Sequence, residues 1–139
     1  MQQFRNLLKY LMPAIVLIML LGLVLSRVIS PEGTDGPVER ISARQAGDYV
    51  GQRAEVCGRV ASATYRPDVG GEPTFLNFER PHPDAVFTVV IWGEARSAWD
   101  SPPEELYADR RVCVEGVVDD HEGTPQIRVE EPARLWIER

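Results

Sequence analysis

The first part of the chain is dominated by one apolar stretch. From Leu7 to Ile29 the sequence runs for 23 residues with almost no polar side chain. At about 1.5 Å of rise per residue, a helix of this length crosses the ~30 Å hydrocarbon core of a bilayer. The pattern therefore predicts that residues 1–30 form a short stub and a single transmembrane anchor helix.

The positive charges around this stretch predict its orientation. Arg5 and Lys9 precede or begin it, whereas Arg27 near its end is soon followed by Glu32. Short flanks rich in Lys and Arg stay in the cytoplasm, so we expect the N-terminus inside and the rest of the chain on the periplasmic side of the inner membrane. The alternative is a cleaved signal peptide, but the region before Pro31 lacks the small-x-small cleavage pattern.

Beyond residue 30 the pattern changes to a short linker and then to a folded domain. Residues 31–40 contain Pro and Gly without an apolar run, which is typical of a linker. Ser42 with Gln45 three positions later matches a capping box and predicts a short helix that ends near Tyr49. Residues 41–139 are the predicted domain.

Alternation of apolar and polar residues dominates this domain. Period-two patterns and runs of β-branched or aromatic residues predict strands, whereas clusters of Pro and Gly predict the loops between them. A longer polar insert over residues 94–109 includes one expected helical turn at Pro103–Tyr107. The predicted strands are Ala54–Val60, Thr74–Phe78, Val86–Trp92, Arg111–Asp119 and Pro125–Glu130, with Leu135–Ile137 as a last short strand or the end of the fifth.

Five main strands, with the longest insert between the third and the fourth, are typical of the OB-fold. This fold is a five-stranded Greek-key barrel, so the predicted class is mainly β with short helices. Gly58 and Gly116 fall inside strands, where such barrels coil sharply or carry bulges. The spacing of Cys57 and Cys113 alone leaves a disulfide and two unlinked thiols equally open. Because the first and fourth strands are neighbours in an OB barrel, the topology favours the disulfide.

The charge of the domain restricts its partners. Residues 31–139 carry 12 arginines, no lysine and all 21 acidic residues of the chain, which gives a net charge of −9. Affinity for nucleic acid comes mainly from neutralised phosphates, so this balance disfavours a general nucleic-acid binder. A stretch of 109 residues is enough for one compact domain.

Several strings of the domain also resemble a known family. Thr74-Phe-Leu-Asn-Phe78 and Phe87-Thr-Val-Val-Ile-Trp-Gly93, together with Gly51–Val60 and Val112–Gly116, are similar to small bacterial OB-fold domains. Members of that family occur alone or fused to exported nucleases and are generally regarded as nucleic-acid binders. The resemblance covers Ile41 to about Ile137. It implies the fold and, as a function, binding of nucleic acid, but the matching residues build strands and are not catalytic.

No residue pattern in the chain indicates a cofactor or a catalytic centre. The anchor followed by a barrel is also similar in layout to the periplasmic haem chaperone of cytochrome c maturation, but neither His82 nor His121 lies in the His-x-x-x-Tyr motif of that family. His121 with its acidic neighbours reads as a solvated turn, and Gly70-Gly71 lacks the Lys and Ser/Thr of a phosphate loop. We expect no cofactor, no metal site and no enzymatic activity.

A binding surface is expected on the outward face of the second and third strands, which is the usual ligand face of an OB-fold. If Leu76 and Phe78 fill the core, their neighbours along the strand point outward. The alternative is that the insert containing Trp99, or a terminal helix, covers this face. The predicted binding residues are Tyr65, Arg66, Phe75, Asn77, Thr88, Val90 and Trp92.

These observations favour a non-catalytic accessory module. The apolar stretch would hold it at the bilayer, and its domain would dock on another membrane protein or complex. The alternative function, implied by the family resemblance, is binding of single-stranded nucleic acid or another extended polymer in the periplasm. The net charge of the domain weighs against this alternative.

Overall fold

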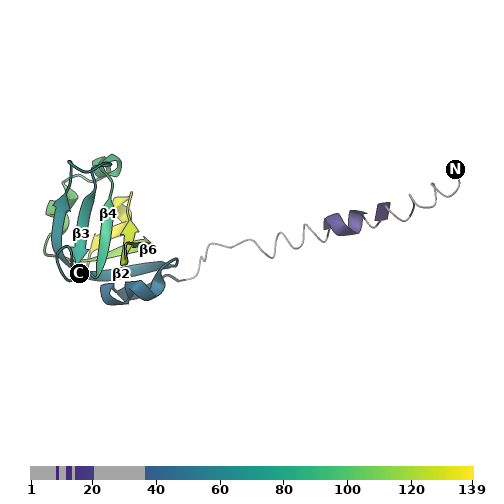
Figure 1. Ribbon diagram of the computed structural model, residues 1–139, viewed down its shortest axis with the longest axis horizontal. Helices are drawn as coiled ribbons and strands as arrows, with labels where there is room; N and C mark the ends of the chain where they lie inside the picture. Colours follow the sequence, from purple (N-terminus) through teal and green to yellow (C-terminus); the bar gives the residue numbers. More distant parts are fainter. Residues whose placement is uncertain (1–8, 10–11, 14, 21–36) are drawn as a thin grey trace. The chain divides into compact units, whose positions relative to one another are not determined.

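The computed structural model describes Lys9, residues 12–13, residues 15–20 and residues 37–139 (Figure 1). The described residues before 21 are helical and exposed. Within the described parts of the chain, no helix combines the length and the apolar character needed to cross a membrane. Most of the predicted span from Leu7 to Ile29, and residues 31–36 of the predicted linker, lie outside the described residues, so the anchor stays a prediction.

Pro37–Arg139 is a compact unit that contains eight strands and four short helices. Each predicted strand is present, and the expected helical turn at Pro103–Tyr107 is an α-helix. The strands are β1 (Glu39–Ser42), β2 (Arg53–Tyr65), β3 (Thr74–Phe78), β4 (Phe87–Ile91), β5 (Arg111–Val117), β6 (Asp119–His121), β7 (Thr124–Arg128) and β8 (Leu135–Ile137). The helices are η1 (Ala43–Tyr49), η2 (Gly93–Ala98), α2 (Pro103–Tyr107) and η3 (Pro132–Arg134).

The connectivity of the longer strands is that of the predicted OB-fold. β2, β3 and β4 follow one another as an antiparallel meander, and β3 and β4 lie side by side in Figure 1. β5 then returns antiparallel to the first half of β2, and β7 lies parallel to β4. The first and fourth main strands, β2 and β5, are therefore neighbours, as predicted.

The prediction of a closed five-stranded barrel is wrong in two respects. The sheet has eight strands in the order β6-β7-β4-β3-β2-β5-β8, with β1 beside β2. No strand pairing among the described residues joins β5 to β7, so the sheet stays open. The chain leaves β5 at Val118, whose N–H donates to Gln52 O at 2.9 Å and whose carbonyl accepts from Gly51 N at 2.8 Å. The N–H and carbonyl of Val118 therefore bond to the turn before β2 and do not extend the pairing toward β7.

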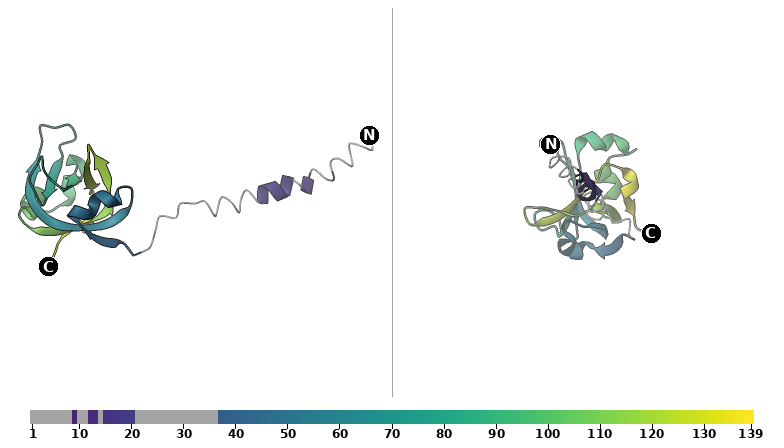
Figure 2. Two further views of the ribbon diagram at one scale, coloured as in Figure 1. Left: turned by 60° about the horizontal axis from the view of Figure 1, so that its bottom comes forward. Right: turned by 90° about the vertical axis from the view of Figure 1, so that its right-hand side faces the viewer.

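β2 is long and strongly curved, as the left view of Figure 2 shows. Its register against β3 shifts between Val60 and Ser62, which marks the bulge at which the strand bends. Gly58 lies just before this bend, and a Cβ there would be 2.9 Å from Phe78 Cδ1. Glycine at this position therefore allows β2 to approach the core closely. The bulge follows two residues later, so the predicted sharp coiling of this strand is present near Gly58.

The core is built from the inward residues of the two halves of the sheet. Phe78 and Phe87 are at its centre, with their ring centroids 5.1 Å apart in an edge-to-face arrangement. At one end Trp99 Nε1 donates to Tyr107 Oη at 3.0 Å, and Tyr107 Oη donates to the carbonyl of Leu135 at 3.2 Å. Helix η1 packs on the core through Ala43 and Ala46, and its predicted capping box between Ser42 and Gln45 is present.

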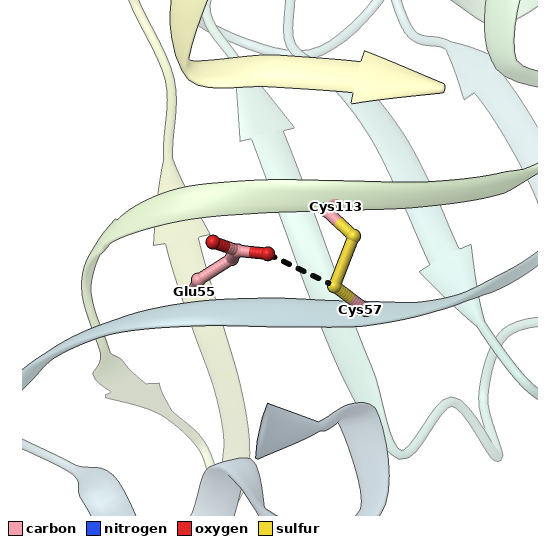
Figure 3. A group of neighbouring side chains, drawn as sticks. All are labelled: Glu55, Cys57 and Cys113. Carbon is pink, nitrogen blue, oxygen red and sulfur yellow. Dashed lines mark hydrogen bonds between the residues drawn. A yellow bond between two sulfur atoms is a disulfide. The ribbon is translucent and has the colours of Figure 1, made fainter. Parts of the chain in front are cut away.

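The predicted disulfide is also present. Cys57 of β2 faces Cys113 of β5 in the strand register, and their sulfur atoms are bonded. Figure 3 shows the bond crossing between the two strands, with Glu55 beside it. Among the described residues no cysteine is free.

Candidate functional site

A row of uncharged polar side chains crosses the outer face of the sheet. Ser62 of β2, Asn77 of β3, Thr88 of β4 and Gln126 of β7 occupy one register line on adjacent strands. Asn77 Nδ2 donates to Ser62 Oγ at 3.0 Å, and Thr88 Oγ1 donates to Asn77 Oδ1 at 3.2 Å. We call these residues the polar ladder. These two hydrogen bonds hold the side chain of Asn77 between Ser62 and Thr88, so its donor and acceptor are oriented before any ligand arrives.

The polar ladder lies in a groove of about 440 Å³. Asn77, Thr88 and Gln126 line it from the sheet. The loop between β3 and β4 and the turn between β6 and β7 also contribute lining residues. This volume is within the range of ligand sites in proteins, which combine apolar walls with a few placed polar groups. The other lining residues are Thr64, Arg66, Phe75, His82, Pro83, Ala85, His121, Glu122 and Thr124.

Both histidines of the chain reach this groove from different loops. His82 lies between β3 and β4, and His121 begins the turn between β6 and β7. From the sequence, His121 is expected in a solvated turn, and nothing in the pattern connects it with His82. What brings the two together is the Greek-key return of β7 beside β4, which the spacing of histidines along the chain does not reveal.

Only part of the predicted binding face belongs to the groove. Arg66, Phe75, Asn77 and Thr88 line it, whereas Tyr65, Val90 and Trp92 do not. Val90 is buried between its register neighbours Phe75 and Arg128. Trp92 packs on the loop before β3, where a Cβ on Gly71 would be 2.8 Å from its ring.

Tyr65 is covered by the insert, in line with the alternative considered from the sequence. The guanidinium of Arg96 in η2 lies over the Tyr65 ring, 3.7 Å from its centroid. Arg96 is held there by two hydrogen bonds to Glu104 of α2, at 2.8 and 3.2 Å, and by a bond to Thr74 Oγ1. The bonded guanidinium holds the pKa of Glu104 below its usual range. Trp99 itself is in the core and does not cover the face.

Replacing Arg96 with methionine is expected to lower the free energy of unfolding by about 2 kcal/mol at pH 7, because a partly buried ion pair and a cation–π contact are lost together. The lowered pKa of Glu104 makes this loss pH-dependent. The ion pair contributes above the unfolded pKa of a glutamate, near 4.3, and is lost as the pH falls through the folded value. Urea unfolding at several pH values measures the difference.

The matched control is Arg66→Met. Arg66 forms an exposed pair with Asp68, at 2.7 Å between Nη2 and Oδ2. Exposed pairs contribute little, so this variant should stay within about 0.5 kcal/mol of the unmodified chain. An equal loss in the two variants would contradict the proposed role of Arg96.

The charges around the groove are close to balanced. Arg66 is its arginine, and the bidentate bond from Arg66 lowers the pKa of Asp68 to about 2, so the two charges stay paired over the usual pH range. Glu122 adds a negative charge on the opposite loop. The groove therefore offers hydrogen bonds, the Phe75 ring and two imidazoles rather than a positively charged track.

One cluster among the described residues has the spacing of metal ligands. Glu55, Cys57 and Cys113 place one ligand atom each within 4.8 Å of one another (Figure 3). The two sulfur atoms are joined as a disulfide and are not available as thiolates. In addition, the Arg40 guanidinium lies 3.2 Å from Cys57 Sγ and would repel a cation. The cluster does not fit a metal ion.

No protein-family model matches this chain, and no curated protein matches it.

The chain is similar to parts of several solved structures. An asparaginyl-tRNA synthetase from Pyrococcus horikoshii is 20% identical over 73% of this chain and 22% of its own, with a TM-score of 0.45. An aspartyl-tRNA synthetase from Entamoeba histolytica is 11% identical over 78% and 24%, with a TM-score of 0.43. An OBody bound to hen egg-white lysozyme is 18% identical over 77% and 98%, with a TM-score of 0.45. The chain thus spans 22–24% of these synthetases, and such distant similarities assign it neither an activity nor a partner.

Proposed function

We propose that this chain is a non-catalytic binding module whose groove receives an extended segment of a partner protein. The single observation that carries the proposal is the polar ladder at the floor of the groove. Its amide and hydroxyl groups are uncharged, and the side chain of Asn77 is held by Ser62 and Thr88. The backbone of an extended peptide in the groove would exchange hydrogen bonds with the edges of these groups that face it. Phe75 on the wall offers a contact for one apolar side chain of that peptide.

The location of the module is the second part of the proposal. We propose that the stretch from Leu7 to Ile29 anchors it in the inner membrane, with the domain on the periplasmic side. The partner would then be a membrane protein or a complex at the same membrane, for which this chain is an accessory subunit. The net charge of −9 over residues 31–139 favours a partner that is not anionic.

The test compares capture of partners by groove variants of the full chain. The chain is extracted in a mild detergent, and co-purifying proteins are quantified by mass spectrometry for the unmodified chain, for Phe75→Ala and for Gln126→Ala. Proteins that contact the groove should be depleted at least tenfold by both substitutions. Val50→Ala, an exposed apolar position outside the groove lining, is the control and should retain them. Equal recovery from all four chains would contradict the proposal.

A second function is favoured by one specific observation. Phe75, Arg66 and the two histidines around the groove are the residue types that stack on bases and contact phosphates. Under this alternative the groove binds single-stranded nucleic acid. Binding to a labelled oligonucleotide that weakens steeply with added salt would favour it, because such binding releases counterions. If the dissociation constant for the oligonucleotide does not change with salt, the result would favour an extended peptide as the ligand of the groove.

A further inference from the structure

The outer face of the sheet formed by β1, β2, β5 and β8 carries a second unusual arrangement, away from the groove lining. Ser42, Cys57, Cys113 and Trp136 lie on one register line across these strands. The disulfide is thus in the middle of the line, with the smallest polar side chain at one end and the largest aromatic one at the other.

One arginine contacts both sulfur atoms of the disulfide. Arg40 of β1 places Nε 3.2 Å from Cys57 Sγ and Nη2 3.3 Å from Cys113 Sγ. Its position is fixed by Glu55, at 3.3 Å from Nε, and by Glu138, at 2.5 Å from Nη2. A neutral disulfide gains little from a guanidinium at this distance, whereas a thiolate gains a charge-assisted hydrogen bond.

We propose that Cys57 and Cys113 form a thiol–disulfide exchange site that reacts with a dithiol partner. Exchange proceeds through a thiolate leaving group, and it is faster when that thiolate is stabilised. A neighbouring arginine is the kind of residue that stabilises a thiolate in reactive cysteine pairs. Arg40 supplies this stabilisation to either sulfur without moving to a new position.

The geometry selects the sulfur that is attacked. Cys57 is 7% exposed and Cys113 is fully buried. A nucleophile must approach along the axis of the S–S bond, so attack on Cys57 comes from the side of its register neighbour Ser42. Attack on Cys113 comes from the side of its register neighbour Trp136, which has the larger side chain. Attack is therefore directed to Cys57, and Cys113 leaves as the thiolate beside Arg40.

The exchange is a balanced two-step reaction. A thiolate of the partner forms a bond to Cys57 Sγ, the Cys57–Cys113 bond breaks, and its electron pair stays on Cys113. The second thiolate of the partner then attacks the partner sulfur of this mixed disulfide and releases Cys57 as a thiolate. The partner dithiol is oxidised to a disulfide. In the reduced protein Cys113 stays a thiolate beside Arg40, and Cys57 takes up a proton.

A surface on which the dithiol partner could dock adjoins the disulfide. A hollow of about 750 Å³ is lined by Arg40, Trp136, Ile137, Glu138 and Arg139. Trp136 is 36% exposed and Ile137 is 41% exposed, so the hollow has an apolar part next to the disulfide. Strands β2 and β5 remain paired on both sides of the bond, from Arg53 opposite Val117 to Arg59 opposite Arg111. This ladder of paired residues would hold the two strands together when the bond is reduced.

The test measures reduction of the disulfide in the folded full chain, kept in mild detergent. The chain is equilibrated with defined ratios of reduced to oxidised dithiothreitol, free thiols are counted by alkylation and mass spectrometry, and circular dichroism monitors the fold. Half-reduction of Arg40→Met should need a ratio at least tenfold higher than that of the unmodified chain. Arg40→Lys keeps the charge and should restore part of the difference.

The control is Arg53→Gln, which removes an ion pair with Glu115 on the same sheet and no contact with sulfur. It should be half-reduced at the ratio of the unmodified chain. In a second measurement, brief treatment with reduced glutathione should give a mixed disulfide at Cys57, identified by peptide mass. The proposal is overturned by equal midpoints for Arg40→Met and the unmodified chain, by thiols that appear only after the fold is lost, or by a mixed disulfide at Cys113.

Discussion

Replacing Phe78 with alanine is expected to lower the free energy of unfolding by about 3–5 kcal/mol, the usual cost of truncating a buried aromatic residue. Phe78 is fully buried and stacks edge-to-face on Phe87 at 5.1 Å. It also fills the space that Gly58 leaves open at the bend of β2, where a Cβ on the glycine would be 2.9 Å from Phe78 Cδ1. Truncation would therefore leave a cavity between β2, β3 and β4. Chemical denaturation followed by tryptophan fluorescence measures the loss.

A second phenylalanine of the same strand provides the control. Phe75 is only partly buried and lines the groove. Its replacement by alanine should cost about 1 kcal/mol or less, because much of the side chain is already in contact with solvent. The pair separates stability from binding: Phe78→Ala should destabilise the domain, whereas Phe75→Ala should weaken partner capture at nearly unchanged stability. Similar stability losses in the two variants would mean that Phe75 is a core residue.

Gly116→Ala is expected to cost about 2 kcal/mol through overpacking. Gly116 is in β5 and faces the core, where an added Cβ would be 2.6 Å from Ile127 Cγ2 of β7. This contact occurs where β5 passes over β7 without pairing to it, so the glycine sets how closely the two strands approach. Ile127 is fully buried and cannot move aside without disturbing its neighbours. Thermal and urea unfolding both report the change.

Gly47→Ala is the control for Gly116→Ala. Gly47 lies in helix η1, and an added Cβ would have no atom within 4 Å. Alanine is the better helix former, so this variant should be neutral or slightly stabilising. If Gly116→Ala retained full stability as well, β5 and β7 would have to be farther apart than the structure places them.

The fold was predictable because its strands have simple patterns. Val86–Trp92 is rich in β-branched and aromatic residues, and Arg111–Asp119 carries Val112, Val114, Gly116 and Val118 at alternate positions, so the two strands follow from propensity and period. β1 and β6 were not predicted. β6 consists of the residues Asp119, Asp120 and His121, all exposed, which have no apolar alternation and pair only because the turn at Gly123 brings them against β7.

The candidate site was only half predictable. Alternation along β3 and β4 placed Asn77 and Thr88 on the outward face, and the structure puts them in the groove. Which outward residues stay accessible depends on the insert, because Arg96 reaches over Tyr65 from η2 and is fixed by Glu104. Contacts between residues so far apart in the sequence leave no periodic pattern from which they could be predicted. The same holds for His82 and His121, which become neighbours of one groove only through the return of β7 to β4.

One strand, β2, belongs to both halves of the domain. Before the bulge it pairs with β1 and β5, and after the bulge it pairs with β3. Cleaving the backbone between Val60 and Ser62 would therefore separate the chain into two pieces that each lack half of a shared core strand. The natural places for a new pair of termini are instead the loop at residues 66–73 and the turn at residues 121–124, where a permuted chain would keep β2 whole.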